Sequence, residues 1–222
     1  MLHSEKLIAL SKKRSKKKGI ISGQDLGKVF AWFRPNELVW NYWVNNYLMG
    51  ENPPSFDILA WNADSTNLSA GLHEQFLDIF LHNSMTKPGA VEVLGTPVNL
   101  GNITADAYVT GGVTDHLTPW QGCYRTTRLL GSECTFVLSN AGHIASLVNP
   151  PGNPKASYYT GPQPGDDPDA WKHKAERKQG SWWEDWIDWV HQRAGQEKNA
   201  PKKLGNTNYP ELEAAPGTYI HG

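Results

Sequence analysis

Apolar and polar positions alternate with two different periods along the chain. Apolar residues recur at helical spacing between residues 68 and 81, which predicts a helix there. The runs AYVTG (107–111) and CTFVLS (134–139) are short, apolar and bounded by turn residues, so they predict strands. Between them, Pro119 suits the first turn of a helix that runs to residue 130. The order strand, helix, strand predicts an α/β fold with a parallel sheet.

Helix signals also occur near both ends of the chain. Residues 2–18 have the composition of a helix, and Pro35 suits the first turn of a helix that ends at Gly50. Near the C-terminus, Ser181 and Glu184 match the S-x-x-E capping box. The face of that last helix is expected to dock it onto the body through four side chains: Trp182, Trp186, Trp189 and Val190.

These signals divide the chain into three regions. Residues 1–90 form a helical, aromatic-rich region. Residues 91–150 hold strands and helices of an α/β core, beginning with two short strands around a turn at Gly95. Residues 151–222 combine a proline-rich excursion, a tryptophan-rich helix and an irregular tail. The excursion is expected to lie on the surface, outside the packed elements, because prolines interrupt it repeatedly: Pro150, Pro151, Pro154, Pro162, Pro164 and Pro168.

Composition and charge argue against several classes of protein. A net charge of −1 provides no overall field that would attract nucleic acid, and no apolar run is long enough to span a membrane. No signal peptide is expected, because the apolar segment 7–10 is too short. Two cysteines do not make a disulfide framework, which fits a reducing cytoplasm. The basic run KKRSKKK (12–18) is expected to be a solvated helix face, with an anionic-surface patch as the alternative.

The segment between residues 30 and 50 contains a high density of aromatic side chains. Such density is typical of a core or an interface, and a lid that faces a substrate is the alternative. The residues concerned are Phe30, Trp32, Phe33, Trp40, Tyr42, Trp43 and Tyr47.

Two titratable residues follow the two predicted strands. Asp115 comes after the strand at 107–111, and His143 comes after the strand at 134–139. Residues just beyond the carboxyl ends of neighbouring parallel strands converge in one crevice, so Asp115 and His143 are expected to meet. Their order in the chain is that of an α/β-hydrolase triad, with Asp115 orienting the imidazole and His143 as general base. Alternatively, Asp115 caps the following helix and His143 is a surface residue.

A nucleophile for this pair is missing from residues 1–222. The fold family places a serine or cysteine on a G-x-[SC]-x-G elbow upstream of the acid and the base, and no such elbow occurs here. Cys123 and Cys134 are expected to be small buried residues, not nucleophiles. No metal site is expected. We therefore expect a chain that lacks the nucleophile and is inactive alone.

Long ordered motifs of the chain resemble poly(3-hydroxyalkanoate) synthases of the single-subunit type. They are FAWFRPNELVWNYWVNNYLMG, PPSFDILAWNADSTNL, GVTDHLTPW, LSNAGHIASLVNPPGNPK, GSWWEDW and LGNTNYPELEAAPGTYI, which together extend over nearly the whole chain. The resemblance is to the C-terminal part of these enzymes. It implies the C-terminal part of an α/β-hydrolase fold with a helical cap segment.

The resemblance also implies an activity. The family transfers (R)-3-hydroxyacyl groups from coenzyme A thioesters to a growing polyester with a Cys–His–Asp triad, whose histidine and aspartate match His143 and Asp115. It implies no cofactor beyond the thioester substrate, a cytoplasmic location at polyhydroxyalkanoate granules, and a homodimer. Trp61 and Asp64 are expected in the cap or pocket, although a structural role suits Asp64 equally. His116 either lines the pocket or bonds the backbone.

Two alternatives to a synthase are open. One is an esterase, depolymerase or thioesterase of the same fold. The other is a non-catalytic module that binds granules or dimerises, which the aromatic density between residues 30 and 50 would suit. The identity of the missing nucleophile would separate the enzymes, because a serine elbow indicates a hydrolase and a cysteine elbow indicates a synthase.

Overall fold

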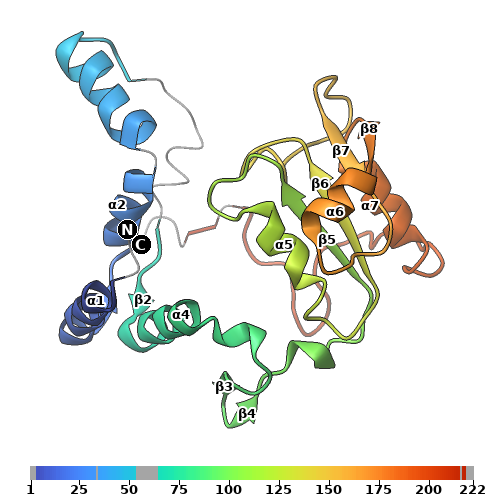
Figure 1. Cartoon of the computed structure of the whole chain (residues 1–222), viewed down its shortest axis with the longest axis horizontal. Helices are drawn as coiled ribbons and strands as arrows, with labels where there is room; N and C mark the ends of the chain where they lie inside the picture. The colour runs from blue at the N-terminus through green and yellow to red at the C-terminus, as the bar shows by residue number, and fades with distance from the viewer. Residues whose placement is uncertain (1–3, 34, 54–64, 216, 219–222) are drawn as a thin grey trace. The chain divides into compact units, whose positions relative to one another are not determined.

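The computed structural model describes residues 4–33, 35–53, 65–215 and 217–218. The chain folds as two compact units. Unit 1 contains residues 1–105 and 129–132, and unit 2 contains residues 106–128 and 133–222. Figure 1 shows the elements of both.

Unit 1 consists mainly of helices. They are α1 (Glu5–Lys18), α2 (Gly23–Phe33), the π-helical turns η1 (Asn36–Trp40) and η2 (Trp43–Leu48), α4 (Ala70–His82) and the 3₁₀ turns η3 (Ser84–Thr86) and η4 (Leu100–Asn102). Two antiparallel pairs of very short strands complete it: β1 (Ile20–Ile21) with β2 (Leu68–Ser69), and β3 (Glu92–Val93) with β4 (Thr96–Pro97). The helices expected at 2–18, 35–50 and 68–81, and the strand pair around Gly95, are thus all present.

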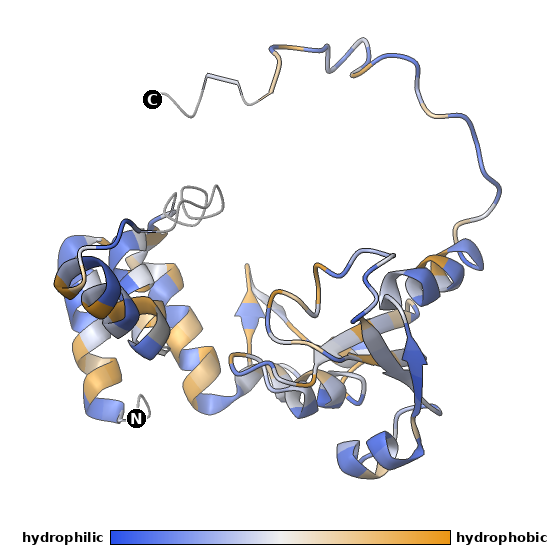
Figure 2. Cartoon of the chain, turned by 90° about the horizontal axis from the view of Figure 1, so that it is seen from above, coloured by the Kyte–Doolittle hydropathy of each residue, from blue (hydrophilic) through white to orange (hydrophobic). Residues whose placement is uncertain are grey.

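Polar contacts join α1 to α4 in unit 1. Nδ1 of His73 lies 3.0 Å from Oγ of Ser15, and both side chains are buried. Beside them, Lys12 pairs with Asp78. Figure 2 shows that hydrophilic and hydrophobic residues both occur along the helices of the chain. The run KKRSKKK lies on α1, where Ser15 is its one buried residue, so most of the run is a solvated helix face as expected.

The aromatic residues of η1 and η2 do not form a core with the described residues. Trp40, Trp43 and Tyr47 are all exposed, and Trp43 stacks on Tyr47 with ring centroids 4.4 Å apart. The sequence favoured a core or an interface, and the core half of that prediction is wrong for these three side chains. An interface or a lid remains the prediction for this segment.

Unit 2 is built on a four-stranded sheet in the order β5–β6–β7–β8. The strands are β5 (Ala107–Gly112), β6 (Cys134–Ser139), β7 (Ser157–Thr160) and β8 (Glu176–Gln179). β5 and β6 are parallel, as expected, whereas β7 and β8 add antiparallel pairs. Among the described residues, β5 has a strand partner on one side only.

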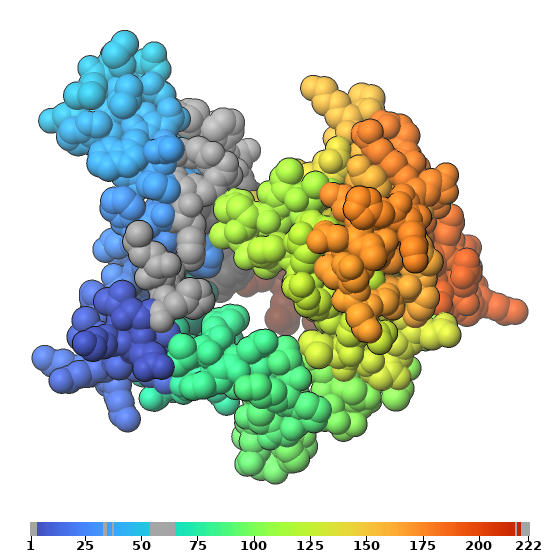
Figure 3. All heavy atoms as spheres, viewed as in Figure 1, coloured from blue at the N-terminus to red at the C-terminus, as the bar shows by residue number. Residues whose placement is uncertain are grey.

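Helices cover both faces of this sheet. On one face, α5 (Trp120–Thr126) and α6 (Pro168–Lys174) contribute side chains to the core. Figure 3 shows the outer surface of these two helices, α5 in yellow-green and α6 in orange. The core residues are Trp120, Tyr124, Phe136, Leu138 and Trp171. On the other face, α7 (Trp182–His191) packs Trp182 and Trp189 against the ring of Tyr108. Adjacent strand residues point to opposite faces, which is why Tyr108 meets α7 while Val109 packs against the core.

The proline-rich stretch is not a surface excursion throughout, which corrects the expectation from the sequence. Ser157 and Tyr158 are buried in β7, and Trp171 of α6 belongs to the core. Pro168 occupies the first turn of α6, where its missing N–H costs nothing, and Asp167 caps that turn. The prolines therefore lie at the ends of packed elements, and the chain between them is not irregular throughout.

Candidate active site

The carboxyl ends of β5 and β6 finish level with each other. Gly112 pairs with Ser139 in the last position of the parallel register. Beyond it, the N–H of Val113 donates to the Ser139 carbonyl at 2.9 Å, and the N–H of Thr114 donates to the Ala141 carbonyl at 3.2 Å. These bonds continue the pairing past the strands, so the loops that carry Asp115 and His143 leave the same edge of the sheet together.

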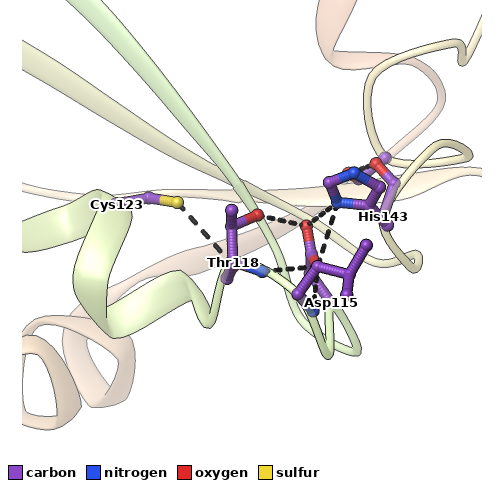
Figure 4. Close-up of polar contacts among 6 residues, drawn as sticks. Asp115, Thr118, Cys123 and His143 are labelled. Carbon is purple, nitrogen blue, oxygen red and sulfur yellow. Dashed lines mark hydrogen bonds and ion pairs between the residues drawn. The ribbon is translucent and has the colours of Figure 1, made fainter. Parts of the chain in front are cut away.

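Asp115 and His143 are in direct contact at this edge. Nδ1 of His143 lies 2.9 Å from Oδ2 and 3.1 Å from Oδ1 of Asp115 (Figure 4). Carboxylate oxygens only accept, so Nδ1 carries the proton and Nε2 of the neutral ring is left as an acceptor. The imidazole is 37% exposed, whereas the Asp115 side chain is 6% exposed. The ring is thus accessible on its Nε2 side and held on its Nδ1 side.

Three donors besides His143 hold the Asp115 carboxylate. Oδ1 accepts from the N–H groups of Leu117 and Thr118, each at 2.9 Å, and Oδ2 accepts from the Thr118 hydroxyl at 2.6 Å. Burial alone would raise the pKa of Asp115, but the hydrogen bonds from Thr118, His143 and Leu117 outweigh it and hold the pKa well below its usual range. Asp115 therefore stays ionised, and it both caps its own turn and orients His143.

The two cysteines do not contact the imidazole. The Cys123 thiol points to the Thr118 carbonyl at 3.8 Å, and Thr118 lies between it and Asp115 in Figure 4. Burial, with a further contribution from the charge of Asp115, raises the pKa of Cys123, which disfavours the thiolate needed for attack. Cys134 is buried at the start of β6. No hydrogen bond reaches Nε2 of His143 from any residue that the structure describes.

The other residues singled out in the sequence are not part of the Asp115–His143 contact. His116 follows Asp115 but is exposed, and within the described ranges its side chain makes no hydrogen bond. Trp61 and Asp64 lie outside the described residues. No group of three or more His, Cys, Asp or Glu side chains in the described part of the chain is arranged to hold a metal ion.

A glycine is needed at Gly112, which the sequence did not indicate. A Cβ atom there would lie 2.9 Å from both the Ala141 carbonyl and the Ser146 hydroxyl, closer than packing allows. At Gly142 a Cβ would meet only Thr114 atoms at 3.6 Å or more, and φ is not positive. The turn before His143 therefore does not require a glycine at position 142. The close approach occurs at the end of β5.

Comparison with known proteins identifies the family. A model of the alpha/beta hydrolase fold matches residues 7–150, which include Asp115 and His143. The chain belongs to the alpha/beta hydrolase fold family. This agrees with the parallel β5–β6 pair and with an aspartate and a histidine beyond its two strands.

Among curated proteins, this hydrolase-fold chain is similar to poly(3-hydroxyalkanoate) polymerases. It is 50% identical to poly(3-hydroxyalkanoate) polymerase 2 of Ectopseudomonas oleovorans and 49% identical to polymerase 1 of the same organism, over 97% and 98% of the chain. It is 41% identical to the poly(3-hydroxyalkanoate) polymerase subunit PhaC of Cupriavidus necator, over 90%. The chain spans 39% of the length of each Ectopseudomonas polymerase and 34% of the Cupriavidus subunit. The resemblance seen in the motifs is thereby confirmed.

Proposed function

We propose that this chain carries the acid and base of a polyhydroxyalkanoate polymerase. The reaction transfers (R)-3-hydroxyacyl groups from coenzyme A thioesters to the end of a growing polyester. His143 is the general base and Asp115 orients it and stabilises its protonated form. The observation that carries the proposal is the contact between Nδ1 of His143 and Asp115, in a chain about half identical to polymerases of that name.

The chemistry matches this geometry. Thioester acyl transfer needs a thiolate, and an imidazole with a free Nε2 can deprotonate a thiol and become a cation beside Asp115. The thiolate attacks the thioester, and the imidazolium gives its proton to the departing coenzyme A thiolate. The neutral nitrogen can then take the proton of the incoming 3-hydroxyl group, so that the alkoxide attacks the acyl-enzyme and releases the cysteine thiolate. No G-x-[SC]-x-G elbow occurs in the 222 residues, and we propose that a cysteine from sequence outside them completes the triad. No cofactor other than the thioester substrate is needed.

The remaining parts of the proposal follow from the family relationship. The helical segment within residues 1–90 acts as the cap segment of the enzyme, and the exposed aromatics of η1 and η2 suit a surface that meets a partner or substrate. The enzyme works as a homodimer in the cytoplasm, at the surface of polyester granules. None of the helices in the described ranges has the length and apolar character to cross a bilayer.

A chimera tests the proposal. The segment of the Ectopseudomonas polymerase 2 that matches this chain is replaced by the 222 residues, and release of coenzyme A from an (R)-3-hydroxyacyl-CoA is measured together with the product. We expect coenzyme A release with polyester as the product. Free 3-hydroxy acid as the sole product would indicate a hydrolase instead. Polymer binding without any coenzyme A release would indicate a non-catalytic module.

A further inference from the structure

The loop that follows His143 is bonded to the N-terminus of α7 by three consecutive residues. The indole N–H of Trp182 donates to the Ser146 carbonyl at 2.6 Å, and the indole N–H of Trp183 donates to the Leu147 carbonyl at 2.9 Å. The Ser181 hydroxyl donates to the Asn149 carbonyl. We call Ser181, Trp182 and Trp183 the clamp. Each member satisfies a different carbonyl of one short loop, so the clamp fixes both the position and the direction of that loop.

The clamp connects to His143 through Ser146. Ser146 is buried, and its hydroxyl donates to the His143 carbonyl at 3.2 Å while its N–H donates to the Gly142 carbonyl at 2.8 Å. Its carbonyl is the one that accepts from Trp182. Ser146 also abuts Gly112, where a side chain would collide with its hydroxyl. A single residue therefore joins the backbone of His143, the end of β5 and the N-terminus of α7.

The helix that carries the clamp is itself held to the strand that leads to Asp115. The Tyr108 hydroxyl on β5 donates to Oδ1 of Asp185 at 2.7 Å, and its ring lies 6.1 Å from that of Trp182. The Ser181 hydroxyl also accepts from the N–H of Trp183, which caps the helix. The loop of His143 is thus held, through α7, to β5, the strand that leads to Asp115. The contacts that hold it do not involve the imidazole.

We propose that Trp182 and Trp183 are positioning residues for His143, acting through their indole N–H groups. Their indole N–H groups bond neither Asp115 nor the imidazole, but backbone carbonyls. They hold the backbone from which His143 projects, so that Nδ1 stays within hydrogen-bond distance of Asp115. That His143 serves as a base rests on the proposed function, whereas the positioning itself does not. Trp182 should have the larger effect on the position of His143, because its hydrogen bond is partly buried and that of Trp183 is exposed.

NMR of the 222-residue chain tests this inference without an activity assay. Trp182→Phe and Trp183→Phe keep an aromatic ring and remove the indole N–H. Trp186→Phe is the matched control, since Trp186 lies on the same helix and, within the described residues, its indole N–H donates to no carbonyl. Two rates are measured: exchange of the His143 Nδ1 proton with water, and exchange of the backbone amides of residues 146–148.

Loss of one hydrogen bond should accelerate exchange about fivefold. We expect Trp182→Phe to raise both rates by at least that factor, Trp183→Phe to raise them less, and Trp186→Phe to leave them unchanged. Faster amide exchange with an unchanged Nδ1 proton would overturn the proposal, because the clamp would then hold the loop without positioning the imidazole. If Trp182→Phe does not fold, Trp183→Phe alone decides, again by whether exchange of the His143 Nδ1 proton rises together with that of the amides.

The chimera then separates this inference from the proposed function. There, Trp182→Phe should lower kcat about fivefold and leave KM unchanged, because the indole N–H bonds the Ser146 carbonyl and is proposed to act through the position of His143, not through substrate binding. An inactive parent chimera would contradict the proposed function and leave the NMR result standing. An active parent with kcat unaffected by Trp182→Phe would contradict the positioning role alone.

Discussion

Thr118 donates a hydrogen bond to each oxygen of the Asp115 carboxylate. Its backbone N–H reaches Oδ1 at 2.9 Å and its hydroxyl reaches Oδ2 at 2.6 Å. Nδ1 of His143 approaches the same two oxygens. The two bonds from Thr118 therefore restrain rotation of the carboxylate, while both of its oxygens face the imidazole. Thr118 should matter for the chemistry although it does not touch the reacting nitrogen.

Thr118→Val tests that role. The change removes the hydroxyl donor, keeps the volume of the side chain and leaves the backbone N–H in place. A charge-assisted hydrogen bond contributes about 1.5–3 kcal/mol, so we expect kcat in the chimera to fall at least tenfold. Thr118→Ser restores the donor and should recover most of the rate. Equal rates for valine and serine would show that the hydroxyl is not needed.

Asp115→Asn should lower the stability of the chain in a pH-dependent way. The pKa of Asp115 is depressed in the folded state, so its ionised form stabilises the fold at pH values above the unfolded pKa of about 3.9. That contribution is lost as the pH falls below this value towards the folded pKa. We expect Asp115→Asn to cost about 2 kcal/mol of unfolding free energy at pH 7.

Urea unfolding of both proteins between pH 7 and pH 3 measures this difference. It should shrink steadily below pH 4, because the Asp115 carboxylate becomes protonated in the unfolded wild-type chain while it stays ionised in the folded one. A difference that is the same at pH 7 and pH 3 would contradict the account of Asp115.

His73 should make unit 1 less stable at mildly acidic pH. Burial, with a smaller contribution from the charge of Lys12, lowers the pKa of His73 from 6.5. A depressed histidine pKa means that the neutral ring stabilises the fold above pH 6.5, and that this contribution is lost as the pH falls from 6.5 towards the folded value. Intrinsic amide exchange slows towards acid, and after correction for this effect the exchange of α1 and α4 amides should accelerate between pH 7 and pH 5. In His73→Asn this acceleration of exchange should vanish. If it persists, a group other than His73 causes it.

Gly112→Ala should destabilise unit 2. The added Cβ would lie 2.9 Å from the Ala141 carbonyl and the Ser146 hydroxyl, so the loop of His143 must move. Overpacking of this kind costs about 1–3 kcal/mol. Gly122→Ala in α5 is the control, since nothing lies within 4 Å of its Cβ and alanine favours a helix by about 1 kcal/mol over glycine. In thermal unfolding, Gly112→Ala should lower Tm and Gly122→Ala should raise it. Similar shifts of Tm in the two variants would contradict the close packing at Gly112.

The central pair could be predicted from the sequence because it depends on regular elements. Strands at 107–111 and 134–139 and a helix between them dictate a parallel pair, and residues just beyond the two strands must then lie close together. The structure places β5 and β6 in that relation, with the helix α5 ending four residues earlier than expected. The Asp-x-x-Thr spacing of Asp115 and Thr118 could have indicated their turn, since an aspartate often accepts from N–H groups two and three residues ahead.

The support of the pair could not be predicted in the same way. The bond from Trp182 to the Ser146 carbonyl joins residues 36 positions apart, and an indole N–H that bonds a distant carbonyl has no periodic signature in a sequence. The strand β7 was missed because the surrounding prolines suggested irregular chain, although the run SYYT has strong strand propensity. Turn residues at the ends of an element say little about whether the element itself is buried.

The most direct test of the account compares two histidines in the chimera. His143→Gln removes the imidazole that contacts Asp115, and His116→Gln makes the same change at the exposed histidine beside it. The rate of coenzyme A release from (R)-3-hydroxyacyl-CoA is measured for both. Loss of a general base typically lowers a rate by about 10²–10⁴, so we predict that His143→Gln loses at least a hundredfold while His116→Gln keeps the parent rate. A His143→Gln chimera that retains the parent rate would contradict the assignment of the base.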